Sequence, residues 1–282
     1  MDRDYLIIAV DSQKKYAIRF LSLSHVIRES LELHEPGVVL ARVYTEFLLA
    51  STILGSRLDE QESILFKMKM AEGSLSINCE VSPRGSMRSA IFPRENRSPE
   101  SLDLTGFLKV VRLNSGNEVY ESVVEMCGEG VQELVRKYLA TSVQTHSLFF
   151  VNADTTDLSN NYALWIEKLP GTPVKEWEAF QTKYLQVDFF KKSFLGTDDP
   201  DVIVGRLFDD PVTILAVTSP KLTCLCSKEK VVGALKLLSA EDLADIFMQG
   251  HGISTECDYC RKVWQVTDEE VKKIMNVKPT LH

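Results

Sequence analysis

The stretches "KLTCLCSKEK" (residues 221–230) and "STECDYCRKV" (residues 254–263) carry four of the six cysteines in this chain. Cys224 and Cys226 are separated by one residue, Cys257 and Cys260 by two, and thirty residues lie between the pairs. Two close pairs of cysteines point to a metal site, to a redox device, or to both. The fold of the C-terminal part of the chain therefore depends on what holds these four sulfurs.

The segment around the cysteines, residues 221–282, has few large apolar side chains. A domain of about sixty residues is marginal without a metal or disulfides. Short helices are expected over residues 227–238, 239–250 and 266–275. Thr267 and Glu270 form a capping box at the start of the last one. These short elements therefore need a metal ion or disulfides to hold them together.

A tetrahedral zinc site would hold these elements together, because each cysteine pair supplies two sulfurs from one tight turn at zinc–sulfur distances of about 2.3 Å. We predict zinc bound by Cys224, Cys226, Cys257 and Cys260. His251 could replace one sulfur, but with four cysteines present an exposed loop histidine is favoured. Four thiolates leave no open position for water or substrate, so the metal is predicted to be structural or a switch. Oxidants attack thiolates, and oxidation would release the metal.

Composition limits the partners and the compartment. The net charge of −8 and the pI near 5.3 argue against nucleic-acid binding, which needs a basic face. The apolar run Leu6–Val10 is too short for a signal peptide, and no stretch approaches the ~20 apolar residues of a membrane span. We expect a cytoplasmic protein, with neither a nucleic-acid nor a membrane partner, in a compartment that keeps thiols reduced.

The pattern of apolar residues predicts an α+β fold. Residues 64–81 and 107–126 alternate in period two, which is typical of hairpins, and residues 40–54 have the spacing of a helix buried over most of its circumference. Strands packed with segregated helices form the α+β class. We predict an N-terminal α+β domain over residues 1–171, a helical, aromatic-rich linker over 172–220, and a small zinc-binding α+β domain over 221–282.

The predicted linker is rich in aromatic side chains. Trp177, Phe180 and Tyr184 fall at helical spacing, and Phe189, Phe190 and Phe194 follow. These side chains either pack on the large domain or form a binding surface that can be covered. Both can hold in different states of the protein.

The other two cysteines lack partners at metal spacing, and we expect Cys79 and Cys127 to be buried strand residues. A loop-rich stretch carries several basic side chains, which we interpret as a solvated face rather than a ligand site. They are Arg84, Arg88, Arg94 and Arg97.

The order Cys-x-Cys, an insert of about thirty residues, then Cys-x-x-Cys near the C-terminus of an acidic chain resembles the heat shock protein 33 family of redox-regulated chaperones. The segment "CLCSKEKVVGALKLLSAEDLADIF" (224–247) is similar to that family's redox domain, and "ECDYC" (256–260) to its second pair, with Trp264 beyond. Similarity extends upstream, for example over "LLASTILGSRLDEQESILFKMKMAEG" (48–73), but residues 76–93 hold less glycine than the family pattern.

This resemblance implies a holdase that binds unfolding or oxidatively damaged proteins without ATP and is not an enzyme. It implies an inactive state that is reduced and zinc-bound, and an active state with disulfides Cys257–Cys260, formed first, and Cys224–Cys226. It further implies a homodimer when active and hand-over of clients to an ATP-dependent chaperone system. The residues expected to bind clients are Trp177, Phe180, Tyr184, Phe189, Phe190 and Phe194.

Two other functions fit the cysteines. A constitutive zinc-ribbon interaction module would keep its metal and its activity after oxidation. A thiol-disulfide oxidoreductase would need an exposed thiolate of low pKa that is free of metal.

Overall fold

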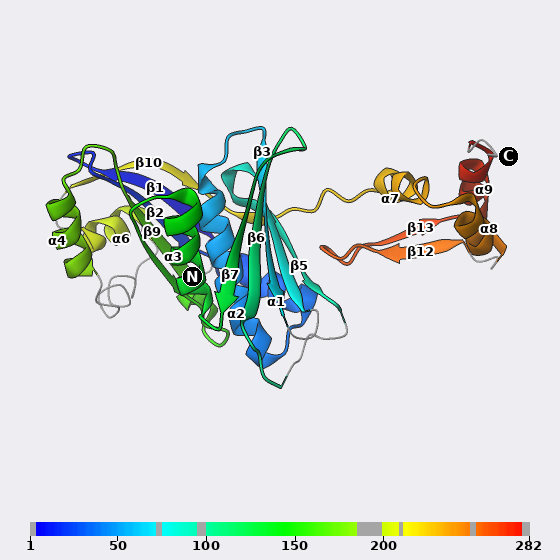
Figure 1. Cartoon of the computed structure of the whole chain (residues 1–282), viewed down its shortest axis with the longest axis horizontal. Coiled ribbons are helices and arrows are strands. Elements are labelled where there is room, and N and C mark those ends of the chain that lie inside the picture. The colour runs from blue at the N-terminus through cyan, green and yellow to red at the C-terminus, as the bar shows by residue number, and fades with distance from the viewer. Residues whose placement is uncertain are drawn as a thin grey trace. The chain divides into compact units, whose positions relative to one another are not determined.

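The computed structural model describes residues 4–71, 75–94, 100–184, 199–208, 211–248 and 252–277. The chain divides into two compact units, Met1–Leu222 and Thr223–His282, called here the first and the second unit. Figure 1 shows the helices and strands of both. Strands and segregated helices together make the α+β fold predicted from the sequence.

One sheet of the first unit has five strands, each antiparallel to its neighbours. In spatial order they are β10 (Val212–Thr218), β1 (Tyr5–Asp11), β2 (Tyr16–Ser22), β9 (Tyr162–Lys168) and β8 (Ser147–Asn152). Strand β10 lies in the segment predicted as a helical linker. Its sequence, VTILAVT, is rich in β-branched residues, which favour strands, and it pairs with β1 at the sheet edge.

The other sheet has six strands and contains both predicted hairpins, β3–β4 and β6–β7. Its strands run antiparallel except for the parallel pair of β11 with β5. In spatial order they are β11 (Lys221–Leu222), β5 (Ser86–Phe92), β4 (Ser76–Val81), β3 (Glu62–Met70), β6 (Thr105–Asn114) and β7 (Asn117–Cys127).

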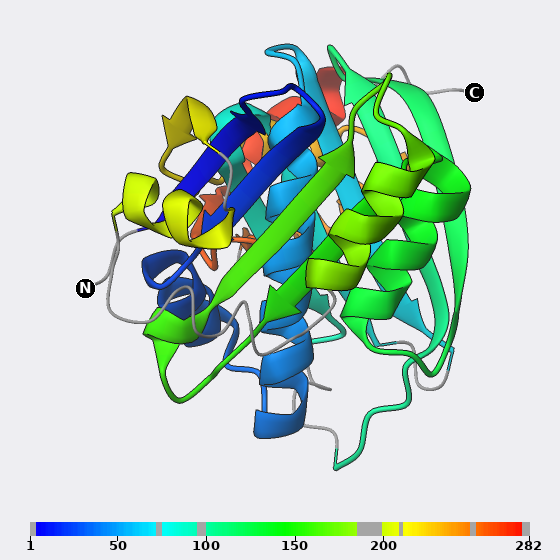
Figure 2. The same cartoon turned by 90° about the vertical axis from the view of Figure 1, so that its left-hand side faces the viewer.

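Helix α2 (Val38–Leu54) lies between these two sheets, as both views of the first unit show (Figures 1 and 2). Together with η1 (Gly55–Arg57) it forms a 20-residue run, Val38–Arg57, that is long and apolar enough to cross a membrane by length and composition. The prediction that no stretch approaches the length of a membrane span was therefore wrong for this run, although its helix was predicted. Of its most apolar window, 72% is buried inside the protein, and burial on every side accounts for this composition.

The remaining elements of the first unit cover the sheets. They are α1 (His25–His34), η2 (Pro83–Gly85), α3 (Val131–Tyr138) continued by a π-helical turn (Leu139–Val143), η4 (Leu158–Asn160), α4 (Val174–Tyr184) and α6 (Pro200–Leu207). A second core cluster, separate from the one around α2, joins α4 and α6 to the five-stranded sheet. It contains Trp177 and Tyr184, each 3% exposed.

The second unit consists of short elements, and its three helices lie at or near the predicted positions. They are α7 (Lys228–Leu235), α8 (Ala240–Met248), β12 (Ile253–Glu256), β13 (Val263–Val266) and α9 (Asp268–Val277). The Thr267–Glu270 capping box forms: the Thr267 N–H donates to Glu270 Oε2 at 2.9 Å, and the Glu270 N–H donates to Thr267 Oγ1 at 3.4 Å. The hairpin of β12 and β13 was not predicted from the sequence.

The second unit has little core. Among its described residues the buried apolar side chains are Leu243, Val266, Val271 and Ile274. Neither of the two hydrophobic clusters includes any of them. Leu237 and Met248 are 87% and 81% exposed, so the unit leaves large apolar groups in solvent.

Candidate metal centre

Two short loops present the four cysteines of the second unit. Cys224 and Cys226 lie in the extended segment before α7, and Cys257 and Cys260 lie in the turn that joins β12 to β13. Backbone hydrogen bonds close this turn: the Cys257 N–H donates to the Lys262 carbonyl, and the Arg261 N–H to the Cys257 carbonyl, both at 2.9 Å. The hairpin register, with Glu256 opposite Val263, therefore sets where the second pair of sulfurs lies.

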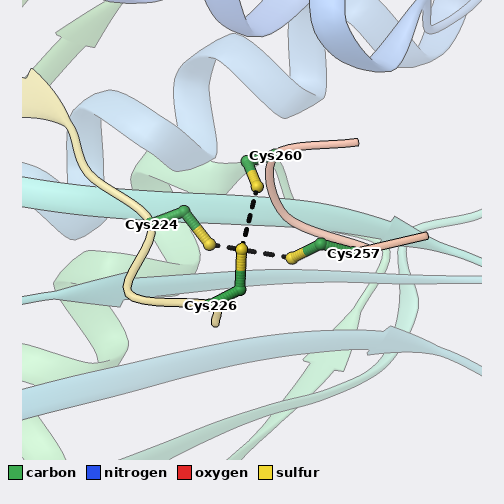
Figure 3. Close-up of side chains that lie close together, drawn as sticks. All are labelled: Cys224, Cys226, Cys257 and Cys260. Atoms are coloured by element: carbon green, nitrogen blue, oxygen red, sulfur yellow. Dashed lines mark hydrogen bonds between the residues drawn. The ribbon is translucent and has the colours of Figure 1, made fainter. Parts of the chain in front are cut away.

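The four sulfurs point toward one another (Figure 3). Cys224 Sγ lies 3.7 Å from Cys257 Sγ, Cys226 Sγ lies 3.4 Å from Cys260 Sγ, and all four lie within 4.8 Å of one another. In a tetrahedron with zinc–sulfur bonds of about 2.3 Å, neighbouring sulfurs are about 3.8 Å apart. A disulfide would bring two sulfurs to about 2.05 Å. The spacing fits four thiolates around one ion, and all four cysteines are free.

The site favours a cation. Burial, together with hydrogen bonding to the other three sulfurs, raises the pKa of the Cys260 thiol to about 12, against a lowering hydrogen bond from the Lys262 backbone. Sulfurs this close repel one another when ionised, so a divalent ion has to offset their charge. Zinc-type ions bind thiolates and keep them deprotonated. The residues present therefore fit a bound metal ion.

Neighbouring groups hold the first cysteine loop in place. Lys230 Nζ donates to the carbonyl of Leu225, the residue between Cys224 and Cys226, at 2.6 Å. Ser227 caps α7 by accepting from the Lys230 N–H at 3.3 Å, so the positive end of the helix dipole lies directly after Cys226. This role of Lys230 was not predicted from the sequence. The signal that could have indicated it is the position of the lysine, the third residue of a helix that begins directly after the Cys-x-Cys pair.

The structure brings together all four predicted metal ligands, and within its described part no other group of three or more His, Cys, Asp or Glu side chains is close enough to hold an ion. His251 lies outside the described residues, as do Phe189, Phe190 and Phe194. The other aromatic residues of the predicted client surface, Trp177, Phe180 and Tyr184, lie on α4 in the first unit.

The remaining cysteines differ from each other. Cys79 is buried, as predicted. The prediction for Cys127 was wrong, because it is exposed. Cys127 ends the edge strand β7, whose Val124 and Met126 face the core while Cys127 lies on the opposite, solvent face.

The predicted basic face is only partly described. Arg88 is half-buried and pairs with Glu80 at 2.6 Å, Arg94 is half-buried, the Arg84 side chain is not described, and Arg97 lies outside the described residues. Arg88 thus takes part in cross-strand pairing within the six-stranded sheet.

The fold and the site define a class: an α+β protein whose small C-terminal unit is built around four cysteines that could hold a metal ion. The model of one protein family, described as "Hsp33 protein", matches residues 4–267. The chain belongs to the Hsp33 family, as its sequence pattern indicated.

Relatives and a solved structure agree with this assignment. A "33 kDa chaperonin" of Lactobacillus acidophilus is 22% identical over 289 residues, which cover 98% of this chain and 97% of that protein. A "33 kDa chaperonin" of Acaryochloris marina is 29% identical over 177 residues, covering 61% of this chain and 59% of that one. The crystal structure of the 33 kDa chaperonin from Thermotoga maritima has the same fold, with a TM-score of 0.76 at 17% identity over 97% of this chain and 98% of that one.

Proposed function

We propose that this member of a chaperone family is a redox-regulated holdase, inactive while its four cysteines bind zinc and activated when they are oxidised. The observation that carries the proposal is the cluster of four sulfurs within 4.8 Å in a unit whose described residues bury only four apolar side chains. Each of those side chains contributes about 1.5–3 kcal/mol on burial. A structural zinc ion contributes on the order of 10–16 kcal/mol in small peptides, so the metal would supply much of this unit's stability.

Zinc is the ion that the donor set favours. Four thiolates at tetrahedral spacing suit zinc, and zinc itself undergoes no redox change. When bound it would hold Cys224 and Cys226 to Cys257 and Cys260 and keep the sulfurs ionised. The site then has no open position for substrate, which accords with a chaperone rather than an enzyme.

Oxidation would convert the ligands into disulfides. In each pair two thiolates lose two electrons to one peroxide molecule and form a sulfur–sulfur bond, and the peroxide takes up two protons and leaves as two water molecules. The family resemblance pairs Cys257 with Cys260 and Cys224 with Cys226. The closest sulfurs in the structure belong to different cysteine pairs, Cys224 with Cys257 and Cys226 with Cys260. In a tetrahedral site all sulfur–sulfur distances are nearly equal, so these distances do not decide which disulfides form. With both pairs oxidised, no thiolate would remain to ligate zinc, so the ion would be released.

Loss of the ion would unfold the second unit and then release α4. In the structure the aromatic face of α4 packs against the five-stranded sheet. Phe180 stacks on Tyr16 with ring centroids 4.1 Å apart, and Trp177 is 3% exposed. Released, this face would offer apolar surface to unfolding clients. We propose Trp177, Phe180 and Tyr184 as part of the client surface, and Phe189, Phe190 and Phe194 as its continuation.

The partners follow from the family resemblance. We propose unfolded or oxidatively damaged proteins as clients, a homodimer as the active form, hand-over to an ATP-dependent chaperone system, and the cytoplasm as the compartment.

The test combines zinc content, free thiols and suppression of aggregation of a heat-denatured protein, each measured before and after peroxide. Wild-type protein should lose about one zinc and four thiols and gain suppression. In the double variant C257S/C260S, suppression should not respond to oxidant, because the Cys257–Cys260 disulfide can no longer form. C127S removes an exposed thiol outside the site and should behave as wild type.

Two results would contradict the proposal. If C257S/C260S still switches as wild type does, these residues are not the trigger. If wild-type protein keeps its zinc and its activity is unchanged by peroxide, the chain is a constitutive zinc-ribbon module.

A further inference from the structure

A cavity of about 200 Å³ lies in the first unit, where the C-terminal end of α2, the six-stranded sheet, the π-helical turn after α3, and β9 meet. Every residue that lines it belongs to the first unit, so it is independent of the cysteine site. The π-helical turn contributes Leu139, Ser142 and Val143 to the wall. Such turns occur often at functional sites.

The interior of the cavity is apolar and aromatic. Trp165 and Leu139 are each 1% exposed, Tyr138 is 5% exposed, and Ile64 is 7% exposed. Arg19 and Arg57 lie over the Trp165 ring, with their guanidinium carbons 4.4 and 5.7 Å from its centroid, so a planar ligand would contact Trp165 next to the Arg57 guanidinium group. The wall therefore favours a flat apolar ligand.

The rim of the cavity is cationic. Arg57 and Arg112 line it, with side chains 45% and 39% exposed. Arg57 comes from the turn after α2 and Arg112 from β6, so two distant segments bring the two guanidinium groups to one opening. An arginine presents its N–H groups as a planar fork, which suits carboxylate and phosphate oxygens.

The two nearby carboxylates do not use all of these donors. Glu167 is shared, with Oε2 accepting from Arg19 Nη1 and Oε1 from Arg57 Nη1, both at 3.3 Å. Glu62 accepts from Arg112 Nη2 at 2.5 Å and from the Asp59 N–H at 2.9 Å.

Three arginines thus face two carboxylates, an excess of one positive charge in a chain of net charge −8. Within the described part of the chain, Arg112 Nε is buried and has no hydrogen-bond partner. The hydrogen bonds with Glu62 and Glu167 occupy Nη2 of Arg112 and Nη1 of Arg57, which leaves the second terminal nitrogen of each guanidinium group for an anion at the rim.

Tyr138 adds a neutral polar group inside the cavity. Burial raises the pKa of Tyr138 to about 12, although Arg112 and Arg57 both act to lower it, so the phenol stays protonated at neutral pH. Arg57, Arg112 and Tyr138 all line this cavity. A protonated phenol can donate to an anionic oxygen.

The volume limits the ligand. A cavity of about 150 Å³ holds one benzene molecule. We propose that this cavity binds a small aromatic acid, one ring that lies against Trp165 and carries a carboxylate or phosphate held by Arg57 and Arg112. This is a ligand site in the chaperone's first unit, separate from client binding and from the metal.

The first test uses full-length protein labelled with 5-fluorotryptophan and fluorine NMR. The three tryptophans give three resonances, assigned with W177F and W264F. Benzoate and phenyl phosphate should each shift the Trp165 resonance and leave those of Trp177 and Trp264 in place. Benzyl alcohol supplies the ring without the charge and inorganic phosphate the charge without the ring, and each should bind at least about tenfold more weakly, because one charge-assisted contact or the ring contact is lost.

The second test compares R57Q with R42Q. Arg19 still pairs with Glu167 in R57Q, so the fold should survive, which thermal melting checks. Arg42, also on the helical run Val38–Arg57, is exposed and paired with Glu46, so R42Q makes the same charge change away from the cavity. R57Q should weaken phenyl phosphate binding at least about tenfold and R42Q should not.

The proposal is overturned if benzyl alcohol binds as tightly as benzoate, if the aromatic acids shift all three resonances or none, or if R42Q and R57Q weaken binding equally. The first two outcomes are measured on wild-type protein labelled with 5-fluorotryptophan. They therefore test the ligand site even if R57Q folds poorly.

Discussion

At the scale of single residues, Cys79 and Cys127 show how strongly surroundings change one functional group. Cys79 is fully buried in β4, and burial raises the pKa of its thiol to about 12. Cys127 ends an edge strand with its side chain in solvent. Because only the thiolate is nucleophilic, the two thiols should differ greatly in reactivity.

We predict that iodoacetamide labels Cys127 in native, zinc-loaded protein and leaves Cys79 unlabelled up to pH 9. With a pKa of about 12, only about one Cys79 thiol in a thousand is ionised at pH 9, and burial excludes the reagent as well. Peptide mass spectrometry after timed labelling gives the rates, and the same labelling in denaturant serves as the control in which both react. Labelling of native Cys79 at a rate similar to that of Cys127 would contradict this burial.

At the scale of elements, α4 is held to the sheet by few side chains. Of its eleven residues only Trp177 and Tyr184 are buried, with Phe180 partly buried between them. The ion pair of Lys15 with Glu176 at 2.5 Å is open to solvent, which screens it, so it holds α4 only weakly. An element with few buried contacts opens at low free energy, which suits a covered binding surface.

We predict that W177A loosens α4 and gives the reduced, zinc-bound protein part of the aggregation suppression that oxidation normally provides. Loss of a buried tryptophan costs about 3–5 kcal/mol, enough to shift α4 toward release. V174A, at a site 62% exposed on the same helix, is the control and should change neither stability nor activity. Thermal melting and the aggregation assay measure both effects. A reduced W177A protein that is destabilised but as inactive as wild type would leave these aromatic residues with a packing role alone.

At the scale of the whole molecule, the two units differ in what stabilises them. The first unit has two clusters of buried apolar side chains around its sheets. The second unit has four buried apolar side chains among its described residues and a cluster of four sulfurs. Removal of a metal should therefore affect the units unequally.

We predict that a chelator in reducing buffer abolishes amide hydrogen-exchange protection from α7 to α9 and leaves protection in α2 and the central strands of the first unit unchanged. Without an ion the four sulfurs no longer join the two turns, and the small core cannot replace the ion. Exchange measured by mass spectrometry, with restored zinc as the control, separates the units. If metal-free, reduced protein keeps its hydrogen-exchange protection in the second unit, the metal does not stabilise this unit.

The local features of this chain could be predicted because they depend on neighbours along the sequence. The Cys-x-Cys and Cys-x-x-Cys turns, the Thr267–Glu270 capping box and the two period-two hairpins each lie within a short window, so spacing alone indicates them. The hairpin of β12 and β13 was missed although it is local, because strands of four residues give too weak an alternation.

What the sequence determined by itself is the class of fold, the four sulfurs and the family pattern. Only the tertiary structure decided that β10 pairs with β1, some two hundred residues away, that Cys127 faces solvent, and that Arg57, Arg112 and Trp165 line one cavity. The physical reason is range: turns, caps and side-chain alternation are set by bonds and contacts between near neighbours. Which face of an edge strand is covered, and which charges meet at a cavity, depends on the packing of segments that no local pattern relates.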